Sequence, residues 1–530
     1  MSQSIPANSQ SSGWTNTSTD FHDKPLLEVR HRPLLLIAVM LVSICQFLDA
    51  TIANVALPHM KVALGASVDS ISWVLTSYIM AGAIFMPMTG WLSDRIGSRN
   101  LFIGGTVLFL VSSAACGAAT SLPEMVLFRA VQGISTAFLG PMTQTILFDV
   151  SPPSKQASTM SYFGMMVMVA PISGPFLGGF LTEYMNWRWI YYVNLPIGIP
   201  ALAVLWWLLP TRPIEGRRLD KAGFLWIGLA LGALQLMLDR GQQKDWLDSW
   251  EIIAEGIVAL SAFWIYLVYT RSTRNPLFRR ELFGNANFLV ALGMMFILGL
   301  TNVALSAVLP TMYQVIYHYP VMDSGLLMAP RGFGVIVTSQ LTVFLMKRYD
   351  FRYIIMIGYL IAAYSIWIMT GWSLDMDSHL IIAASFVQGL GLGMVFAPMN
   401  MLAFGTIKPE LRPDGSSLMA LFRNLGGSFG ISWIVTMLAR NQQASHEDLA
   451  GTLTADTFPT IDLPAVVDRL PGGGTGVMQI IDSEVTRQAA MISYLDNFYV
   501  IFWVLLAVAP LPFLLKKPQE PEDIRHTPME

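Results

Sequence analysis

Charged side chains are scarce in this sequence of 530 residues, of which Asp, Glu, Lys and Arg together make up only 13%. Soluble domains usually contain about 25%, so this low share excludes an ordinary soluble globular protein. Cysteine is nearly absent as well, since the chain has only Cys45 and Cys116. Both lie in apolar runs, and we expect them to pack as small apolar residues instead of forming a disulfide or a metal site.

The sequence also lacks the signatures of nucleotide-dependent and metal-dependent enzymes. The glycine-rich stretch 472–476 is not followed by Lys and Ser or Thr, which argues against an ATP-driven pump. The GLGLG of 389–393 lies within an apolar run instead of following a strand. The 7 histidines show no metal-ligand spacing, and the net charge of −3 gives no indication of nucleic-acid binding. We therefore expect no enzyme, no bound cofactor or metal, and no nucleic-acid partner.

Apolar residues make up 54% of the chain and gather into fourteen long runs. A helix needs roughly 17–25 apolar residues to cross a bilayer, and each run meets this requirement. The pattern predicts an all-α polytopic membrane protein with fourteen transmembrane helices. Residues 1–24 are polar and Ser-rich, and the first apolar run is too long for the core of a signal peptide. We expect that run to remain as the first membrane span.

The distribution of Lys and Arg between alternate loops indicates the orientation. With the N-terminus in the cytoplasm, the inner segments hold roughly three times as many basic residues as the outer segments. This excess predicts a multi-pass protein of the cytoplasmic (inner) membrane with both termini in the cytoplasm. The loops 90–100, 210–221 and 271–285 would be cytoplasmic, and the polar segment 439–493 would lie outside.

Two stretches of the sequence repeat each other weakly. Residues 131–142 read VQGISTAFLGPM, and residues 387–399 read VQGLGLGMVFAPM. If the seventh and eighth spans are an insertion, each stretch belongs to the fourth helix of a six-helix half, as in transporters built from two related halves. Chance similarity between two glycine-rich helices is the alternative. The repeat predicts a cytoplasmic tail at 1–33, a six-helix lobe at 34–209, an inserted helix pair at 222–270, a second six-helix lobe at 287–515 that includes the outer loop 439–493, and a cytoplasmic tail at 516–530.

Small residues and prolines are concentrated in the fifth apolar run, where residues 164–179 read GMMVMVAPISGPFLGG. Ala170, Gly174 and Gly178 recur every four residues and therefore line one face of a helix. Such a face lets a second helix approach closely in lipid, so an ordinary packing seam is one interpretation. A functional motif is the other, comprising Gly164, Pro171, Gly174, Pro175, Gly178 and Gly179.

Charged residues within the apolar runs are functional candidates, because an unpaired charge is costly inside a membrane. Asp49 in the first run and Arg129 in the fourth lie within about one helical turn of the same depth. An Asp that faces an Arg across a cavity can bind and release a proton, whereas a static ion pair is the alternative. The second half has no acid in 286–322, and Ser385 stands where the repeat would place an arginine. This asymmetry favours the coupling role.

Three further polar residues are candidates for lining a transport cavity. Gln132 lies one turn after Arg129, while Arg331 and Arg423 each lie about two turns into an apolar run of the second half. Each of these two arginines could line the cavity or could pair with helix dipoles and backbone carbonyls. The sequence leaves both interpretations open.

Several motifs, taken in order, resemble one known family. They are LDATIANVALP at 48–58, GWLSDRIGSRN at 90–100, Arg129 with Gln132 and Gly133 as RxxQG, the G…GPxxGG of 164–179, NWRWIYYVNLPIG at 186–198 and LFRNLGGSFG at 421–430. Together they resemble the fourteen-helix drug:proton antiporter group (EmrB/QacA type) of the major facilitator superfamily, over nearly all of 34–515. Ser98 and Asn100 depart from the family pattern, because basic residues are common at these positions.

The resemblance implies a major facilitator fold of two six-helix lobes with two inserted helices, driven by the proton gradient without a cofactor. It identifies 164–179 as the antiporter motif. It also makes 90–100 a gating loop that stabilises the outward-facing state, for which a solvated turn is the alternative. The gating residues would be Gly90, Asp94, Arg95, Gly97 and Arg99, with Asp149 as the expected partner.

The activity implied by the resemblance is export of small amphipathic, drug-like compounds in exchange for protons. Such exporters in bacteria with two membranes work with a periplasmic adaptor and an outer-membrane channel. The segment 439–493 would then be a docking surface for the adaptor, and a flexible loop with partial helix is the alternative. Because a fold does not by itself decide function, a dedicated exporter or importer of one metabolite and a non-transporting receptor or scaffold also stay open.

Overall fold

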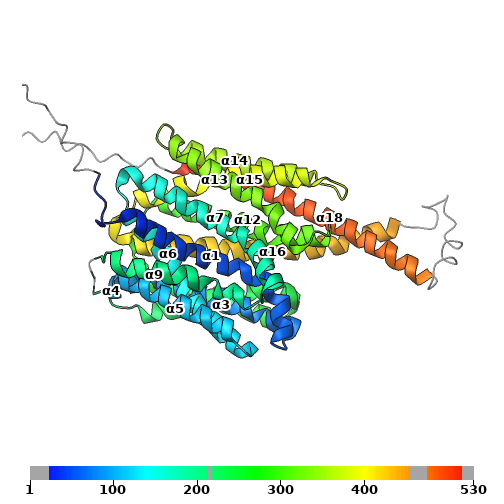
Figure 1. Cartoon of the computed structure of the whole chain (residues 1–530), viewed down its shortest axis with the longest axis horizontal. Helices are drawn as coiled ribbons and strands as arrows, with labels where there is room; N and C mark the ends of the chain where they lie inside the picture. The colour runs from blue at the N-terminus through cyan, green and yellow to red at the C-terminus, as the bar shows by residue number, and fades with distance from the viewer. Residues whose placement is uncertain (1–22, 213, 215, 453–473, 516–530) are drawn as a thin grey trace, which may run out of the picture.

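The computed structural model describes residues 23–212, 214, 216–452 and 474–515, and its long elements are all α-helices (Figure 1). Within this part of the chain, 14 helices are long and apolar enough to cross a membrane. The predicted class, an all-α polytopic membrane protein, is therefore confirmed.

Six spans form the N-terminal lobe. They are α1 (Arg32–Ala63), α3 (Trp73–Phe85) continued through η1 (Met86–Met88) into α4 (Thr89–Ile96), α5 (Ser98–Ala118), α6 (Leu122–Asp149), α7 (Pro153–Tyr184), and α8 (Trp189–Tyr192) continued by α9 (Asn194–Leu208). A short helix, α2 (Val68–Ile71), precedes α3. Pro87 lies in η1, where its missing backbone donor explains the break within the second span.

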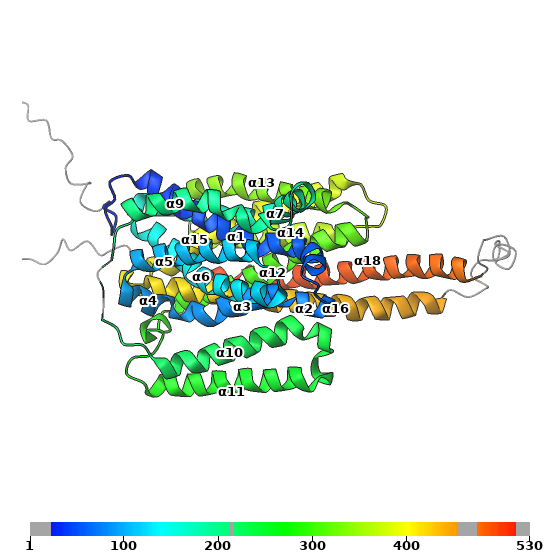
Figure 2. The ribbon, with the colours of Figure 1, turned by 60° about the horizontal axis from the view of Figure 1, so that its bottom comes forward.

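Six further spans form the C-terminal lobe. They are α12 (Ala286–Val315), α13 (Val321–Leu345), α14 (Phe351–Thr370), α15 (Ser378–Gly405), α16 (Arg412–Thr452) and α18 (Gly474–Val508). Between the lobes in sequence come α10 (Lys221–Arg240) and α11 (Trp250–Ser272). This pair lies at the side of the bundle, with α10 packed on α3 (Figure 2). Only 22% of the apolar window of α11 is buried, against 67% for α6, so α11 faces mainly lipid.

The two lobes share one packing scheme. In the first lobe α1 packs on α7 and α3 on α6, and in the second α12 packs on α16 and α13 on α15. A Cβ atom at Gly133 would overlap the carbonyl oxygen of Tyr78, and a Cβ atom at Gly389 would overlap that of Arg331. The repeated VQG thus marks the same close helix contact in both lobes, which supports two related halves over chance similarity.

The outer segment is more helical than the sequence suggested. We expected the thirteenth span to end near 438, yet α16 continues to Thr452, and α18 begins at Gly474. A helix of 41 residues is about 60 Å long, twice the thickness of the hydrocarbon core. The ends of α16 and α18 therefore project together beyond the other helices (Figures 1 and 2), and His446 contacts Asp482 across them at 3.1 Å.

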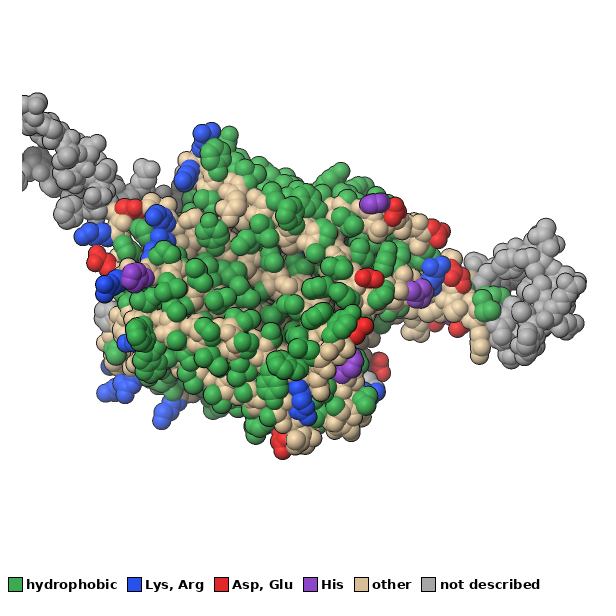
Figure 3. Space-filling view, in the orientation of Figure 1, with side chains coloured by type: hydrophobic (Ala, Val, Ile, Leu, Met, Phe, Trp, Pro, Cys, Tyr) green, Lys and Arg blue, Asp and Glu red, His purple; other side chains and the backbone are tan. Residues whose placement is uncertain are grey.

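The surface agrees with a membrane-embedded bundle. Figure 3 shows hydrophobic side chains over the middle of the visible face, while Lys and Arg gather mainly at its left end. The chain enters α1 at this end, and an even number of spans returns residue 515 to the same side.

The first prediction concerns topology. A reporter fused at residue 460 should report the outer side, and reporters fused in 90–100 and 271–285 should report the cytoplasm, because basic loops are retained inside. Paired phosphatase and fluorescent-protein fusions at each position measure this. A cytoplasmic reading at 460 would contradict the arrangement of fourteen spans.

Candidate functional site

A buried ion pair occupies the interior of the N-terminal lobe. Arg129 on α6 donates from Nη1 to Oδ2 of Asp49 on α1 at 2.7 Å, and both side chains are fully buried. Oδ1 of Asp49 accepts from Gln132 Nε2 at 3.0 Å and from Asn194 Nδ2 at 3.1 Å. The carboxylate therefore has three donors from two further helices, and the two residues that the sequence placed at one depth are in contact.

The guanidinium of Arg129 is enclosed on its remaining sides. Its Nε donates to the carbonyl of Val74 at 3.2 Å, and its centre lies 4.2 Å from the ring of Tyr78, both on α3. The ring of Tyr191 lies at 5.7 Å. Every partner belongs to the N-terminal lobe, so the charge pair is compensated within that lobe and is shielded from the other lobe.

The small-residue face of α7 packs directly on α1. A Cβ atom at Gly174 would overlap Thr51 Oγ1, and one at Gly178 would come within 3.0 Å of Ile52 Cγ1. Pro171 and Pro175 both lie inside the continuous helix α7. This contact places the motif helix within one turn of Asp49 along α1, so any shift of α7 acts on the helix that carries the carboxylate.

The other faces of α7 contact the C-terminal lobe. Gly179 faces Val321 at the start of α13, and a Cβ atom at Gly325 would lie 3.0 Å from the backbone nitrogen of Phe176. Further inward, Gly164 leaves room for the ring of Phe396 on α15. The α7 helix is therefore a contact surface between the lobes.

Aromatic rings meet where the lobes face each other. The ring of Phe163 on α7 lies 6.5 Å from that of Phe47 on α1 and 5.8 Å from that of Phe396 on α15. Asn400 on α15 accepts a hydrogen bond from Gln144 on α6 beside them. The interface thus combines apolar rings with a few amides, and these side chains are buried where the lobes meet.

The 90–100 segment, which we predicted as a loop, is helical except at Gly97, because α4 continues to Ile96 and α5 begins at Ser98. It forms ion pairs with segments outside the N-terminal lobe. Oδ2 of Asp94 lies 3.4 Å from Nη1 of Arg217 and 3.1 Å from Nη2 of Arg279, both in the segments that flank the inserted pair. Arg217 also contacts Asp414 on α16 at 3.0 Å. A Cβ atom at Gly90 would overlap Asp414, and Gly97 has a φ of 87°, which explains both glycines.

The prediction that Asp149 pairs with the basic residues of this segment is wrong. Asp149 contacts Arg212 and, at 3.0 Å, Arg412, because these arginines reach the inner end of α6 while the basic residues of the loop do not. Arg99 donates instead to the carbonyl of Trp206 on α9, and Arg95 is exposed. The cluster is nevertheless an inter-lobe contact, since Arg412 and Asp414 belong to the C-terminal lobe.

The sequence analysis did not identify the roles of several of these residues. Arg212, Arg217 and Arg279 were interpreted only as topology signals, and Asp414 was not singled out. The sequence did contain one relevant signal: the acids at 94, 149 and 414 and the basic linker residues all lie in segments predicted to be on the cytoplasmic side. Only the fold shows that the linkers cross between the lobes at this end.

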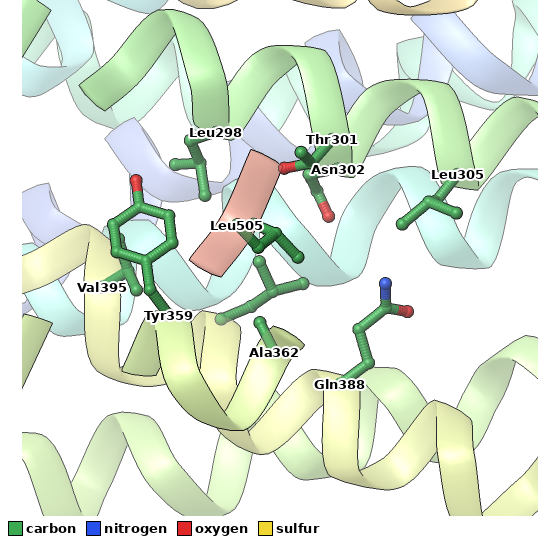
Figure 4. Close-up of a pocket in the computed structure, with 10 residues that line it drawn as sticks. Leu298, Thr301, Asn302, Leu305, Tyr359, Ala362, Gln388, Val395 and Leu505 are labelled. Atoms are coloured by element: carbon green, nitrogen blue, oxygen red, sulfur yellow. The ribbon is translucent and has the colours of Figure 1, made fainter. Parts of the chain in front are cut away.

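A small cavity, lined mainly by apolar side chains, lies inside the C-terminal lobe, between α12, α14, α15 and α18 (Figure 4). Its volume of about 10 Å³ holds about one water molecule, so it is too small for a drug. Gln388, which the repeat relates to Gln132, points into it opposite Asn302, and its Oε1 has no hydrogen-bond partner among the described residues. The second lobe thus keeps the glutamine of the motif without the ion pair.

Arg331 and Arg423 both lie in the second lobe. Arg331 donates to Ser306 Oγ at 3.0 Å and to Asn302 Oδ1, both on α12. The guanidinium of Arg423 lies 5.3 Å from the ring of Phe47. Arg331 therefore bonds neutral side chains, and Arg423 reaches the interface between the lobes.

Known proteins share this sequence over most of its length. The chain is 32% identical over 501 residues to the multidrug export protein EmrB of Escherichia coli strain K12, covering 93% of this chain and 97% of that protein. It is 34% identical over 419 residues to EmrB of Haemophilus influenzae, covering 78% and 81%. It is 31% identical over 480 residues to the fatty acid resistance protein FarB of Neisseria gonorrhoeae, covering 89% and 94%.

Solved structures share the fold at low sequence identity. The human organic anion transporter MFSD10 matches with a TM-score of 0.56 at 12% identity, over 89% of this chain and 99% of that chain. The proton:xylose symporter XylE matches with a TM-score of 0.56 at 13% identity, over 91% and 98%. The profile of the Major Facilitator Superfamily matches residues 39–431. With this match, the paired lobes and the relatives above, the chain belongs to the major facilitator superfamily.

Proposed function

We propose that this protein is a proton-coupled secondary transporter that exports amphipathic, drug-like compounds across the cytoplasmic membrane. The export activity is supported by the similarity to proteins named for multidrug export. The proton coupling is supported by one observation, the Asp49–Arg129 ion pair with both side chains fully buried. Both termini would lie in the cytoplasm, in accordance with the basic loops.

Protonation of Asp49 would change the packing of two helices. The neutral carboxyl group loses the ionic attraction that holds α6 to α1, while Arg129 keeps its bonds to Gln132 and to the carbonyl of Val74. Since α1 also packs on the glycine face of α7, a shift of α1 passes to the interface between the lobes. A proton taken up outside and released inside would in this way accompany each movement of the lobes.

The ion pairs of Asp94, Asp149 and Asp414 with linker and α16 arginines would act as the cytoplasmic gate. Its members bridge the lobes through Arg412 with Asp149 and through the linker residue Arg217 with Asp94 and Asp414. A substrate from the cytoplasm enters between the lobes only when these contacts separate. Asp149 and Asp414 are buried and Arg412 and Arg217 are only 12–13% exposed, so opening the gate would have to hydrate these charges as their contacts separate.

The second prediction tests the proton site. Asp49→Asn keeps the size of the side chain and its hydrogen bonds to neutral partners but removes the charge. We expect substrate binding to persist while uphill export is lost, because the site can no longer alternate between charged and neutral forms. Export in proteoliposomes under an imposed pH gradient measures this.

The matched control is Asp323→Asn, which neutralises an exposed acid in the first turn of α13. This variant should export like the unmodified protein. If Asp49→Asn still accumulates substrate against its gradient, the proton site is elsewhere and the ion pair is purely structural.

The third prediction tests the close contact of α7 with α1. Gly174→Leu should abolish transport while the protein still reaches the membrane, because the new side chain would overlap Thr51. The control is Gly104→Leu on α5, where an added Cβ atom meets nothing within 4 Å. Resistance of expressing cells, normalised to the amount of membrane protein, is the measurement. Equal activity of the two variants would show that the α7 face tolerates bulk.

The projecting ends of α16 and α18 would serve as a docking surface for a periplasmic adaptor that leads to an outer-membrane channel. The supporting observation is that the described ends of both helices extend past the bundle side by side, with Asn441 donating to Asp496 at 3.4 Å between the two helices. Two helices that pack side by side present a more rigid surface than a flexible loop would.

The fourth prediction tests this surface. Replacing residues 443–483 by a short Gly-Ser linker should leave transport in proteoliposomes intact, because the described buried residues of α18, which begin at Val485, stay in place. The same change should lower drug resistance in cells that carry a second membrane. Unchanged resistance of those cells would exclude the projecting ends of α16 and α18 as the docking surface.

A further inference from the structure

The two lobes differ in the charge they carry deep in the membrane. In the N-terminal lobe the deep charges are Asp49 and Arg129, which neutralise each other. In the C-terminal lobe the deep charges are Arg331 and Arg423, and neither forms an ion pair with any described residue. The described interior of this lobe therefore carries two positive charges without a matching acid.

Arg423 is placed at the interface between the lobes. It lies 11 residues after the start of α16, about 16 Å from the cytoplasmic end of that helix. The backbone around it is fixed, since a Cβ atom at Gly299 on α12 would overlap the carbonyl oxygen of Arg423. Its side chain is partly accessible and extends to the ring of Phe47 on α1. Among the described residues, this ring is its one assigned contact.

Arg331 adds positive charge near the same interface. It is fully buried, its hydrogen bonds go to neutral Asn302 and Ser306, and its Nε has no partner among the described residues. Nδ2 of Asn302 reaches the sulfur of Met168 on α7 at 3.3 Å, so this bonded group borders the other lobe. Both arginines thus raise the electrostatic potential where the lobes meet.

An uncompensated guanidinium at this depth costs several kcal/mol, so it marks a place where an anion binds favourably. The cation–π contact with Phe47 offsets only about 0.5–2 kcal/mol of that cost. The ring of Phe163 lies 6.5 Å from that of Phe47, and the ring of Phe396 follows at 5.8 Å from Phe163, so an apolar body next to the charge would meet aromatic side chains. Asp49 does not repel an anion here, because residues 47 and 49 point to nearly opposite sides of α1 and Asp49 is paired.

We propose that Arg423, together with Phe47, binds the carboxylate or sulfonate of an amphipathic organic anion, and that such anions are the substrate class of this protein. The inference rests on the proposed export function and narrows it. A planar guanidinium donates two parallel hydrogen bonds to such a group, which an ammonium cannot.

Two fluorescent probes that share one aromatic skeleton test the site. 1-Anilinonaphthalene-8-sulfonate carries the anion, and N-phenyl-1-naphthylamine is the same molecule without it. Binding is measured with the full chain in nanodiscs, and the signal of empty nanodiscs is subtracted. Arg423→Gln keeps one neutral donor but removes the charge and the second bond, so it should weaken binding of the sulfonate at least about 10-fold and leave binding of the neutral probe unchanged.

The control variant is Arg440→Gln, which removes an exposed arginine from the same helix. It should leave both affinities unchanged. Arg423→Lys, which keeps the charge and is the milder change, should retain part of the sulfonate affinity. Equal weakening of both probes in Arg423→Gln would overturn the proposal, since it would show a general packing defect.

A competition with the unmodified protein avoids any folding defect. Decanoate should displace the bound sulfonate probe, while decyltrimethylammonium and inorganic phosphate should not. Displacement by the cation as effectively as by decanoate would overturn the anion site, and displacement by phosphate would show a site for any anion, without the apolar component. If the protein exports the neutral probe while Arg423→Gln leaves the affinity for the sulfonate probe unchanged, the proposed function stands and this inference fails. If it neither binds nor exports either probe, both fail.

Discussion

A lipid bilayer offers no hydrogen-bond partner to a backbone amide or a charged side chain, and this constraint accounts for most of the structure. It explains why the long elements of the described chain are helices, and why charges gather at the two ends of the bundle (Figure 3). It also makes each deep charge informative. Asp49 and Arg129 meet the constraint by pairing, whereas Arg331 and Arg423 meet it only in part.

The helix α1 joins the features that matter for transport. On one side Asp49 faces Arg129, and on another Phe47 faces Arg423 of the opposite lobe. The glycine face of α7 meets α1 at Thr51, one turn along the same face as Phe47. A proton on one side of this helix and a substrate on another would therefore bias the position of the same rigid element, which is how two sites become energetically coupled.

Close glycine contacts appear in both lobes, although the sequence analysis singled out only one set as a functional motif. In the second lobe, Cβ atoms at Gly426 and Gly430 on α16 would overlap the carbonyl oxygens of Phe296 and Leu300 on α12. This repeats the contact of Gly174 with α1. Helices that approach backbone to backbone have few alternative arrangements, so these contacts favour movement between the lobes over large rearrangements within them.

The sequence by itself determined the class, the number of spans and the membership of the family, because apolar runs and short motifs are local signals. It also placed Asp49 and Arg129 at one depth, since helix rise converts residue number into depth. The tertiary structure alone decided that Asp149 meets Arg212 and Arg412, and that Arg423 reaches Phe47. Those contacts join different lobes and linkers, and residue spacing within one helix carries no information about which faces of distant helices meet.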